Sequence, residues 1–291
     1  MTDNASKTAE FMAFFRAIES GYPRERRLFE DCFARGFLRT PLKLASYIPY
    51  IPFMGSFAPW LIDKKWSGAR PSGIARTRLI DDFLISGLQN GIEQVVILGA
   101  GYDCRAYRIP AMQDKLVFEV DHPNTQAEKR KKLEKIMGSI PSHVVFAAID
   151  FNKDKLENVL DRSGFDKAKK TFFIWEGVTN YLSSDAVDKT IRVISTSAAG
   201  SQLLFTYVHR DIIDAPQKFL NTSSLQELLN QAGEPWTFGF YPEELQQYLE
   251  IRGLKLLEDM SSVDYRIRYM NRFGKHLEGY AFYRAAFAEV I

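Results

Sequence analysis

Short apolar runs alternate with amphipathic segments along most of the chain. Runs rich in Val, Ile and Phe, which predict buried strands, occupy residues 95–98, 117–121, 144–149, 171–175, 203–208, 254–260 and 280–288. Apolar side chains at helical spacing mark residues 74–88, residues 123–137 and a helix that Ser184 can cap. This alternation predicts an α/β fold with a mostly parallel seven-stranded sheet, right-handed crossovers and helices on both faces.

The N-terminal region has a different pattern. Residues 8–20 carry Phe and Ile at helical spacing and predict an amphipathic helix. Residues 37–62 are dense in aromatic and aliphatic side chains, and four prolines break any long helix there. We interpret this segment as an apolar lid packed on the core that also forms the wall of a pocket for an apolar substrate. Phe53 and Phe57 are its candidate substrate contacts.

These patterns divide the chain into two regions. An N-terminal helical segment with the apolar lid covers residues 1–73, and an α/β domain covers residues 74–291. The length suits a single large structural unit, so we expect the two regions to form one.

The composition and charge of the chain argue against several classes of function. A net charge of +2 gives no reason to invoke nucleic acid as a partner. Two cysteines do not make a disulfide framework, and the histidines lack metal-ligand spacing, so no metal is expected. The first ten residues lack the apolar core of a signal peptide, and no apolar run approaches the ~18 residues of a spanning helix. We expect a cytoplasmic protein without stable membrane insertion, and we leave its oligomeric state open.

The candidate chemistry lies at the ends of four consecutive strands. The first strand is followed by Gly99 and Gly101, and a glycine turn lets the backbone approach a ligand closely. The next three strands end at Asp121, Asp150 and Glu176. Ligands of open parallel sheets bind at this edge, where a carboxylate at a strand tip can hold the hydroxyls of a ribose. The pattern predicts a site for a nucleoside-bearing ligand.

The turn departs from the dinucleotide fingerprint. That fingerprint needs a third small residue, Gly or Ala, where this chain has Cys104. Asp103 also brings a negative charge near the place where a phosphate would lie. A cofactor without phosphate, such as S-adenosylmethionine, fits better. A nicotinamide-dependent dehydrogenase and a non-enzymatic nucleoside-binding module stay as alternatives.

Four stretches resemble the leucine carboxyl methyltransferase family. They are Ala-Arg-Thr at 75–77 and the longer motifs at 98–108, 118–123 and 175–182. The similarity is greatest to the bacterial and fungal branch that includes polyketide O-methyltransferases, although that family usually has threonine at the position of Cys104. The resemblance implies a Rossmann-like class I methyltransferase fold with an N-terminal helical lid, and S-adenosyl-L-methionine as cofactor. It also implies O-methylation of a carboxylate or phenolic hydroxyl on an apolar small molecule such as a polyketide. A protein C-terminal carboxyl group is the alternative acceptor.

The resemblance assigns cofactor-binding roles to the strand-end residues. Arg76 would pair with the methionyl carboxylate, which suits the fork of a guanidinium. Its alternative role is a surface salt bridge to Asp81 or Asp82. Gly99 and Gly101 would let the methionyl portion lie against the turn, and Glu176 would approach its amine and sulfonium. At the other end Asp121 would bind the ribose, and Asp150 with Phe151 would bind the adenine.

The acceptor side is less defined by the sequence. A carboxylate acceptor is already ionised near neutral pH, whereas a hydroxyl benefits from a general base. His209, at the end of the strand at 203–208, is the candidate base, with a loop histidine bound to backbone as the alternative. Arg210 could hold an anionic acceptor and Tyr181 could line the acceptor pocket.

Overall fold

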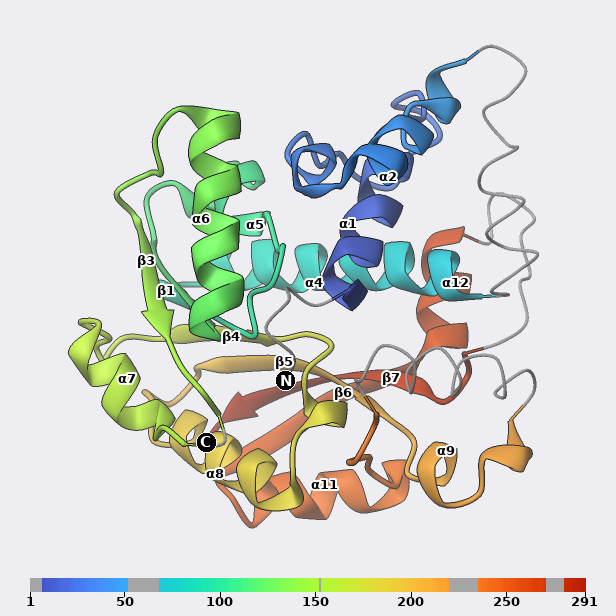
Figure 1. Ribbon diagram of the computed structural model, residues 1–291. Coiled ribbons are helices and arrows are strands. Elements are labelled where there is room, and N and C mark those ends of the chain that lie inside the picture. Colours follow the sequence, from blue (N-terminus) through green and yellow to red (C-terminus); the bar gives the residue numbers. More distant parts are fainter. Residues whose placement is uncertain (1–6, 52–67, 152, 220–234, 271–279) are drawn as a thin grey trace.

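One sheet of seven strands forms the centre of the computed structural model, which describes residues 7–51, 68–151, 153–219, 235–270 and 280–291 (Figure 1). The strand order is β3-β2-β1-β4-β5-β7-β6. Strands β1 to β5 pair in parallel, and β7 runs antiparallel to both β5 and β6. The strands are β1 (Gln94–Leu98), β2 (Leu116–Asp121), β3 (Val144–Ala148), β4 (Thr171–Trp175), β5 (Gln202–Val208), β6 (Leu254–Ser261) and β7 (Tyr283–Val290). The mostly parallel, Rossmann-like sheet predicted from the sequence is confirmed.

Helices cover both faces of this sheet (Figure 1). The described α-helices are α1 (Lys7–Glu19), α2 (Thr40–Ala45), α4 (Ala69–Gln89), α5 (Arg105–Arg108), α6 (Pro123–Met137), α7 (Leu156–Arg162), α8 (Ser184–Ile194), α9 (Asp211–Asp214), α11 (Pro242–Glu250) and α12 (Ser262–Met270). Short 3-10 turns occur at η1 (Ala34–Phe37), η2 (Ile48–Tyr50), η3 (Pro110–Met112), η4 (Thr179–Tyr181) and η5 (Pro216–Lys218). Within the described ranges, no helix has the length and apolar character needed to cross a bilayer.

Two apolar layers form because successive side chains of a strand point to opposite faces. Val95 and Ile97 of β1 belong to the core layer that also contains apolar residues of α1, α4, α6 and α12. Val96 and Leu98 belong to the opposite layer, together with residues of α7, α8 and α11. Burial on both faces explains why the strands appear in the sequence as continuous apolar runs.

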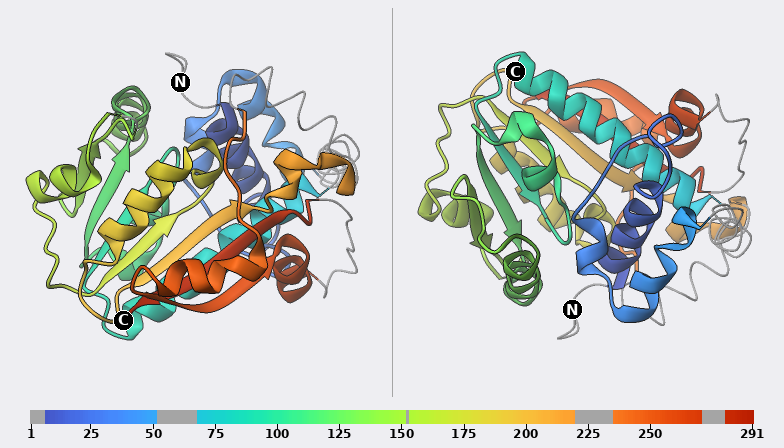
Figure 2. Two further views of the ribbon diagram at one scale, coloured as in Figure 1. Left: turned by 90° about the horizontal axis from the view of Figure 1, so that it is seen from below. Right: turned by 90° about the horizontal axis from the view of Figure 1, so that it is seen from above.

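The N-terminal region packs on the α4 side of the sheet. Helix α1 contacts α4 and lies beside it when the molecule is seen from above (Figure 2). The segment predicted as a packed apolar lid packs on the core only in part over its described residues: Phe37 and Leu38 are buried. Leu44, Tyr47 and Tyr50 are instead 67%, 45% and 53% exposed. The prolines leave only α2 and η2 there, and elements this short present no continuous apolar face to the core. Phe53 and Phe57 lie outside the described residues.

Several predicted boundaries shift. Helix α4 begins at Ala69, since Gly68 adopts a left-handed conformation and Pro71 is tolerated in a first helical turn. The predicted division between residues 73 and 74 therefore falls inside a helix. Ser183, not Ser184, caps α8, because its side chain accepts a hydrogen bond from the Ala186 N–H. Strand β7 begins at Tyr283, three residues later than predicted.

Candidate functional site

A cavity of about 510 Å³ opens at the carboxyl ends of the parallel strands. Its volume falls within the range of small-molecule sites. Eight sequence-predicted site residues line it together: Arg76, Gly99, Gly101, Asp121, Asp150, Phe151, Glu176 and Tyr181. The cavity is therefore the candidate site.

The glycine turn after β1 has the conformation that its sequence predicts. Gly99 and Gly101 have φ angles of 64° and 41°, which L side chains rarely adopt. A Cβ at Gly99 would lie 2.3 Å from Cγ2 of Val178, so the space on that side is filled. A Cβ at Gly101 would meet Ala9 only at 3.5 Å. Both glycines line the cavity, but in the direction of a side chain Val178 fills the space at Gly99, whereas Gly101 has only an ordinary contact with Ala9.

Asp121 joins the tip of β2 to this turn. Its carboxylate accepts hydrogen bonds from the backbone N–H groups of Gly101 and His122. Burial raises the pKa of Asp121, and these two hydrogen bonds offset part of the effect. Each carboxylate oxygen has a second lone pair, so Asp121 can still accept hydrogen bonds from the two hydroxyls of a ribose.

Glu176 and Arg76 form the opposite end of the cavity. Arg76 Nε lies 2.7 Å from Glu176 Oε1, with the arginine side chain only 9% exposed. Arg76 is therefore no surface partner of Asp81 or Asp82. A second guanidinium, that of Arg105, lies 2.9 Å from Glu176 Oε2. Burial disfavours the ionised carboxylate, but the charges of Arg76 and Arg105 outweigh it and lower the pKa of Glu176.

A chain of buried ion pairs supports Arg105 from behind. Its Nε lies 2.8 Å from Asp81, which also binds Arg108 at 2.7 Å. Arg105 also pairs with Asp103, and although burial opposes ionisation, this pairing holds the pKa of Asp103 at about 2. The negative charge of Asp103 is thus compensated and does not by itself repel a phosphate. The departure from the dinucleotide fingerprint rests instead on Cys104, which is buried.

A further buried pair lies under the glycine turn. Lys129 of α6 has its Nζ 2.7 Å from Oε2 of Glu119 on β2, and both side chains are at most 2% exposed. The same Nζ lies 3.5 Å from the carbonyl oxygen of Ala100, between the two glycines. Lys129 therefore ties α6 to the turn that faces the ligand.

Helix α1 supplies the N-terminal wall of the cavity. Ala9, Phe11, Met12 and Phe15 line it, whereas none of the described residues 37–51 does. Arg16 follows on the same helix, pairs with Asp31 at 2.8 Å and donates a hydrogen bond to the Tyr102 carbonyl. The wall assigned from the sequence to residues 37–62 is thus formed, in the described part of the chain, by the preceding helix.

His209 and Arg210 do not line the cavity. The His209 ring packs against Phe219 and Tyr241, with centroid distances of 5.6 and 5.7 Å. Its Nδ1 accepts a hydrogen bond from the backbone N–H of Asp211. Arg210 is partly exposed and pairs with Asp214 at 2.8 Å. Geometry gives neither residue a contact with the site, so their roles stay predictions.

Aromatic side chains extend the cavity beyond Glu176. Tyr283, at the start of β7, lies under the Arg76 guanidinium, whose Cζ is 4.9 Å from the ring centroid. Trp236 packs on Tyr283 with a centroid distance of 6.3 Å. Both residues line the cavity, as does Tyr280. These residues could not be predicted from the sequence, because they lie in segments whose position is set only by folding.

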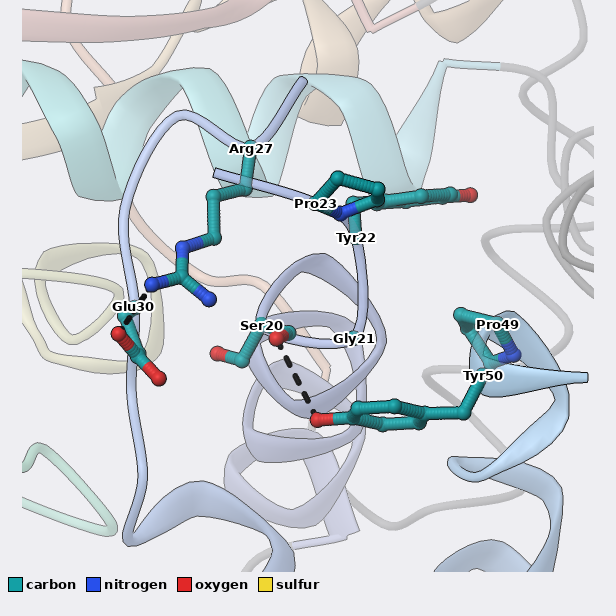
Figure 3. Close-up of a pocket in the computed structure, with 8 residues that line it drawn as sticks. All are labelled: Ser20, Gly21, Tyr22, Pro23, Arg27, Glu30, Pro49 and Tyr50. Carbon is teal, nitrogen blue, oxygen red and sulfur yellow. Dashed lines mark hydrogen bonds and ion pairs between the residues drawn. The ribbon is translucent and has the colours of Figure 1, made fainter. Parts of the chain in front are cut away.

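A second hollow, of about 430 Å³, lies between the loop after α1 and η2 (Figure 3). Within it Arg27 pairs with Glu30, and the Tyr50 hydroxyl donates to the Ser20 carbonyl at 3.4 Å. It shares no described lining residue with the larger cavity and contains none of the strand-end carboxylates. We therefore assign the candidate site to the larger cavity.

Comparison with known proteins agrees with this geometry. The leucine carboxyl methyltransferase family matches residues 9–195. The chain is 34% identical over 276 residues to YktD of Bacillus subtilis (strain 168), covering 90% of each protein. It is 31% identical over 227 residues to FRAAL3718 of Frankia alni, covering 74% of this chain and 75% of that protein. Both relatives are assigned as S-adenosyl-L-methionine-dependent methyltransferases.

A solved structure shares the fold. A protein from Thermobifida fusca YX, assigned as a methyltransferase, superposes with a TM-score of 0.56 over 95% of this chain and 94% of its own, at 18% identity. Together with the family match over residues 9–195, these findings show that the chain belongs to the leucine carboxyl methyltransferase family, a family of methyltransferases that use S-adenosylmethionine.

Proposed function

We propose that this protein transfers a methyl group from S-adenosyl-L-methionine to an oxygen of an apolar small molecule, either a carboxylate or a phenolic hydroxyl. The observation that carries the proposal is the convergence of the glycine turn, Asp121, Glu176 and Arg76 on one cavity. In this proposal the end of β2, which carries Asp121, serves the nucleoside, and the end of β4 on the other side of β1, which carries Glu176, serves the amino-acid part.

The residues present fit the cofactor. Asp121 offers acceptors to the ribose, and Asp150 with Phe151 offers an acceptor and an aromatic face to the adenine. Glu176 can accept from the methionyl ammonium, while Arg76 can bind its carboxylate. The carboxylates of Asp121, Asp150 and Glu176 in the described lining offer acceptors to a ligand with several hydrogen-bond donors, whereas the charge of Asp103 is already compensated by Arg105.

The bound cofactor supplies an electrophilic methyl group on a sulfonium. What the chain supplies is alignment, because holding two reactants in line removes much of the barrier to a substitution. Arg105 fixes the Glu176 carboxylate from behind, and Glu176 in turn fixes Arg76. A carboxylate acceptor then needs no further proton transfer, whereas a hydroxyl must release its proton as the new bond forms.

The alternatives differ in what they require of the site. Methylation of a protein C-terminus would place an anionic chain end in the cavity. A nicotinamide-dependent dehydrogenase would need close packing at the third position of the turn, where Cys104 stands buried. A non-enzymatic module would bind the cofactor without turnover.

The test combines binding with turnover. We expect calorimetry to show binding of S-adenosylmethionine and S-adenosylhomocysteine and no binding of NAD. Radiolabelled cofactor, offered with a panel of phenols, aromatic carboxylic acids and peptides with free C-termini, should give a labelled small-molecule ether or ester. Labelling of the peptides alone, or binding without any transfer, would overturn the proposal.

A further inference from the structure

The cavity wall next to Glu176 is rich in aromatic residues. Tyr283 lies against Arg76, and a Cβ built on Gly177, the residue after Glu176, would stand 3.7 Å from the Tyr283 hydroxyl. Trp236 packs on Tyr283 and lines the same cavity. This wall therefore adjoins the end of the cavity assigned to the methionyl group, which is where an acceptor must sit.

Two polar atoms of this wall lack partners. Asn180 is only 1% exposed, and its Oδ1 is buried without a hydrogen-bond partner in the described part of the chain. Nε1 of Trp236 is also buried without a hydrogen-bond partner among the described residues. The two residues lie on adjacent segments, because the backbone N–H of Thr237 donates to the Asn180 carbonyl at 2.8 Å. A buried polar atom without a partner destabilises a fold, so an acceptor on one of these adjacent segments and a donor on the other, both lining one cavity, indicate a ligand that satisfies both.

Among the described lining residues, no cation is left for an anionic acceptor beyond the two arginines that already form ion pairs. Arg16 and Arg76 are the two arginines among the described lining residues, which include no lysine. Arg16 pairs with Asp31 and Arg76 with Glu176. A carboxylate entering this space would meet the ionised Glu176 and the Asn180 oxygen without a positive partner of its own.

On the basis of the proposed function, we infer that the acceptor is a neutral hydroxyl on a flat aromatic molecule, held by Asn180 and Trp236, rather than a carboxylate. A hydroxyl is donor and acceptor at once. It can donate to Asn180 Oδ1 while accepting from Trp236 Nε1, and the aromatic wall contacts the ring that bears it.

These two residues position the acceptor and take no part in the proton balance. During transfer the hydroxyl oxygen bonds to the methyl carbon, and the carbon–sulfur bond breaks with its electron pair going to sulfur. The hydroxyl proton leaves to solvent. Neither an amide nor an indole is a base at neutral pH, so Asn180 and Trp236 act by binding.

Binding of a matched pair of probes tests the inference. The protein saturated with S-adenosylhomocysteine is titrated with 2-naphthol and with 2-naphthoate. We expect 2-naphthol to bind at least about tenfold more tightly. Asn180→Ala and Trp236→Phe should each lower the affinity for 2-naphthol by about five- to tenfold, the effect of losing one hydrogen bond. Trp236→Phe keeps an aromatic ring but removes the N–H together with the five-membered ring of the indole, and Asn90→Ala, at the exposed end of α4, is the control.

Several outcomes would overturn this assignment. Equal or tighter binding of 2-naphthoate would do so, as would unchanged 2-naphthol affinity in both site variants or no binding of either probe. Weakened S-adenosylhomocysteine binding in Asn180→Ala and Trp236→Phe would show instead that the pair serves the cofactor. The transfer product separates the two proposals. A methyl ester as the sole product refutes the hydroxyl assignment and leaves O-methylation standing, whereas cofactor binding without methylation of any oxygen refutes the proposed function itself.

Discussion

Arg105 holds Glu176 from the side away from the cavity, with its Nη1 2.9 Å from Oε2 of that carboxylate. The guanidinium is 3% exposed and also binds Asp81 and Asp103. It does not line the cavity itself. Arg105 is therefore a positioning residue: it sets the orientation and charge of the Glu176 carboxylate, which lines the cavity.

Replacing Arg105 by methionine should weaken both the fold and the site. The change leaves Asp103 buried beside no counter-charge of comparable proximity, and loss of one partner of a buried ion pair costs about 3–5 kcal/mol. Urea unfolding should show a loss in this range, and calorimetry should show cofactor affinity reduced about tenfold or more. Arg192→Met, which breaks an exposed pair with Asp188, should leave the stability close to that of the parent, because exposed ion pairs contribute little. Similar stability of the two variants would contradict the role given to Arg105.

Glu176 should make stability depend on pH. Its pKa is lower in the folded chain than the ordinary value of 4.5, so its ionised form stabilises the fold above that pH. This stabilisation is lost as the pH falls through the lowered pKa. In Glu176→Gln the acid-side loss should be smaller, because the titrating group is gone, and cofactor affinity at pH 7 should fall about tenfold or more. Parallel urea titrations from pH 7 to pH 3 measure the difference between parent and variant.

Asp121 should change the pH dependence of stability in the direction opposite to Glu176. Burial raises the pKa of Asp121 above the ordinary 3.8. Its ionisation therefore lowers the free energy of unfolding of the unliganded protein as the pH rises through the raised pKa. We expect the Asp121 carboxylate to bind the ligand. Asp121→Ala should therefore weaken cofactor binding by about 1.5–3 kcal/mol, the value of a hydrogen bond to a charged group. Affinity of the parent should also decline on acidification through the raised pKa. Calorimetry at several pH values tests both effects, and a folded Asp121→Ala variant with parental affinity would remove Asp121 from the site.

The strand-end constellation could be predicted because it follows from local rules. Gly99, Gly101, Asp121 and Glu176 each sit directly after an apolar run, and parallel strands bring their carboxyl ends to one edge. The same sequence could not assign Lys129, which lies in a highly charged helix. Its burial against Glu119 depends on how α6 rotates over the sheet.

The walls of the cavity were harder to predict for a related reason. Density of aromatic residues pointed to residues 37–62, yet helix α1 provides the described N-terminal wall. Tyr283 reaches the site through the antiparallel return of β7 beside β5, and Trp236 reaches it because the next residue, Thr237, is hydrogen-bonded to Asn180. The spacing of apolar residues in the sequence indicates which faces of the elements are apolar. Tertiary packing determines which of these faces line the cavity.

The two glycines of the turn should respond differently to alanine. Both substitutions carry the cost of a left-handed conformation, about 1–2 kcal/mol. Gly99→Ala adds a contact of 2.3 Å with Val178 and should destabilise the protein more than Gly101→Ala in urea. Gly101→Ala places its methyl group in more open space. It should therefore destabilise the protein less than Gly99→Ala but still reduce cofactor affinity. Equal effects of the two variants on stability and binding would contradict this description of the turn.

His209 provides the last prediction. The geometry places its ring among Phe219 and Tyr241, with Nδ1 bound to the Asp211 backbone and no contact with the cavity. Loss of a general base slows a chemical step by about 10²–10⁴-fold, whereas loss of a packing residue leaves that step nearly unchanged. We expect the single-turnover rate of His209→Ala, with saturating cofactor and an identified hydroxyl acceptor, to stay within about threefold of the parent across pH. A rate drop of 10²-fold or more, with unchanged acceptor affinity, would instead make His209 the base and would require the segment that carries it to move toward the cavity on binding.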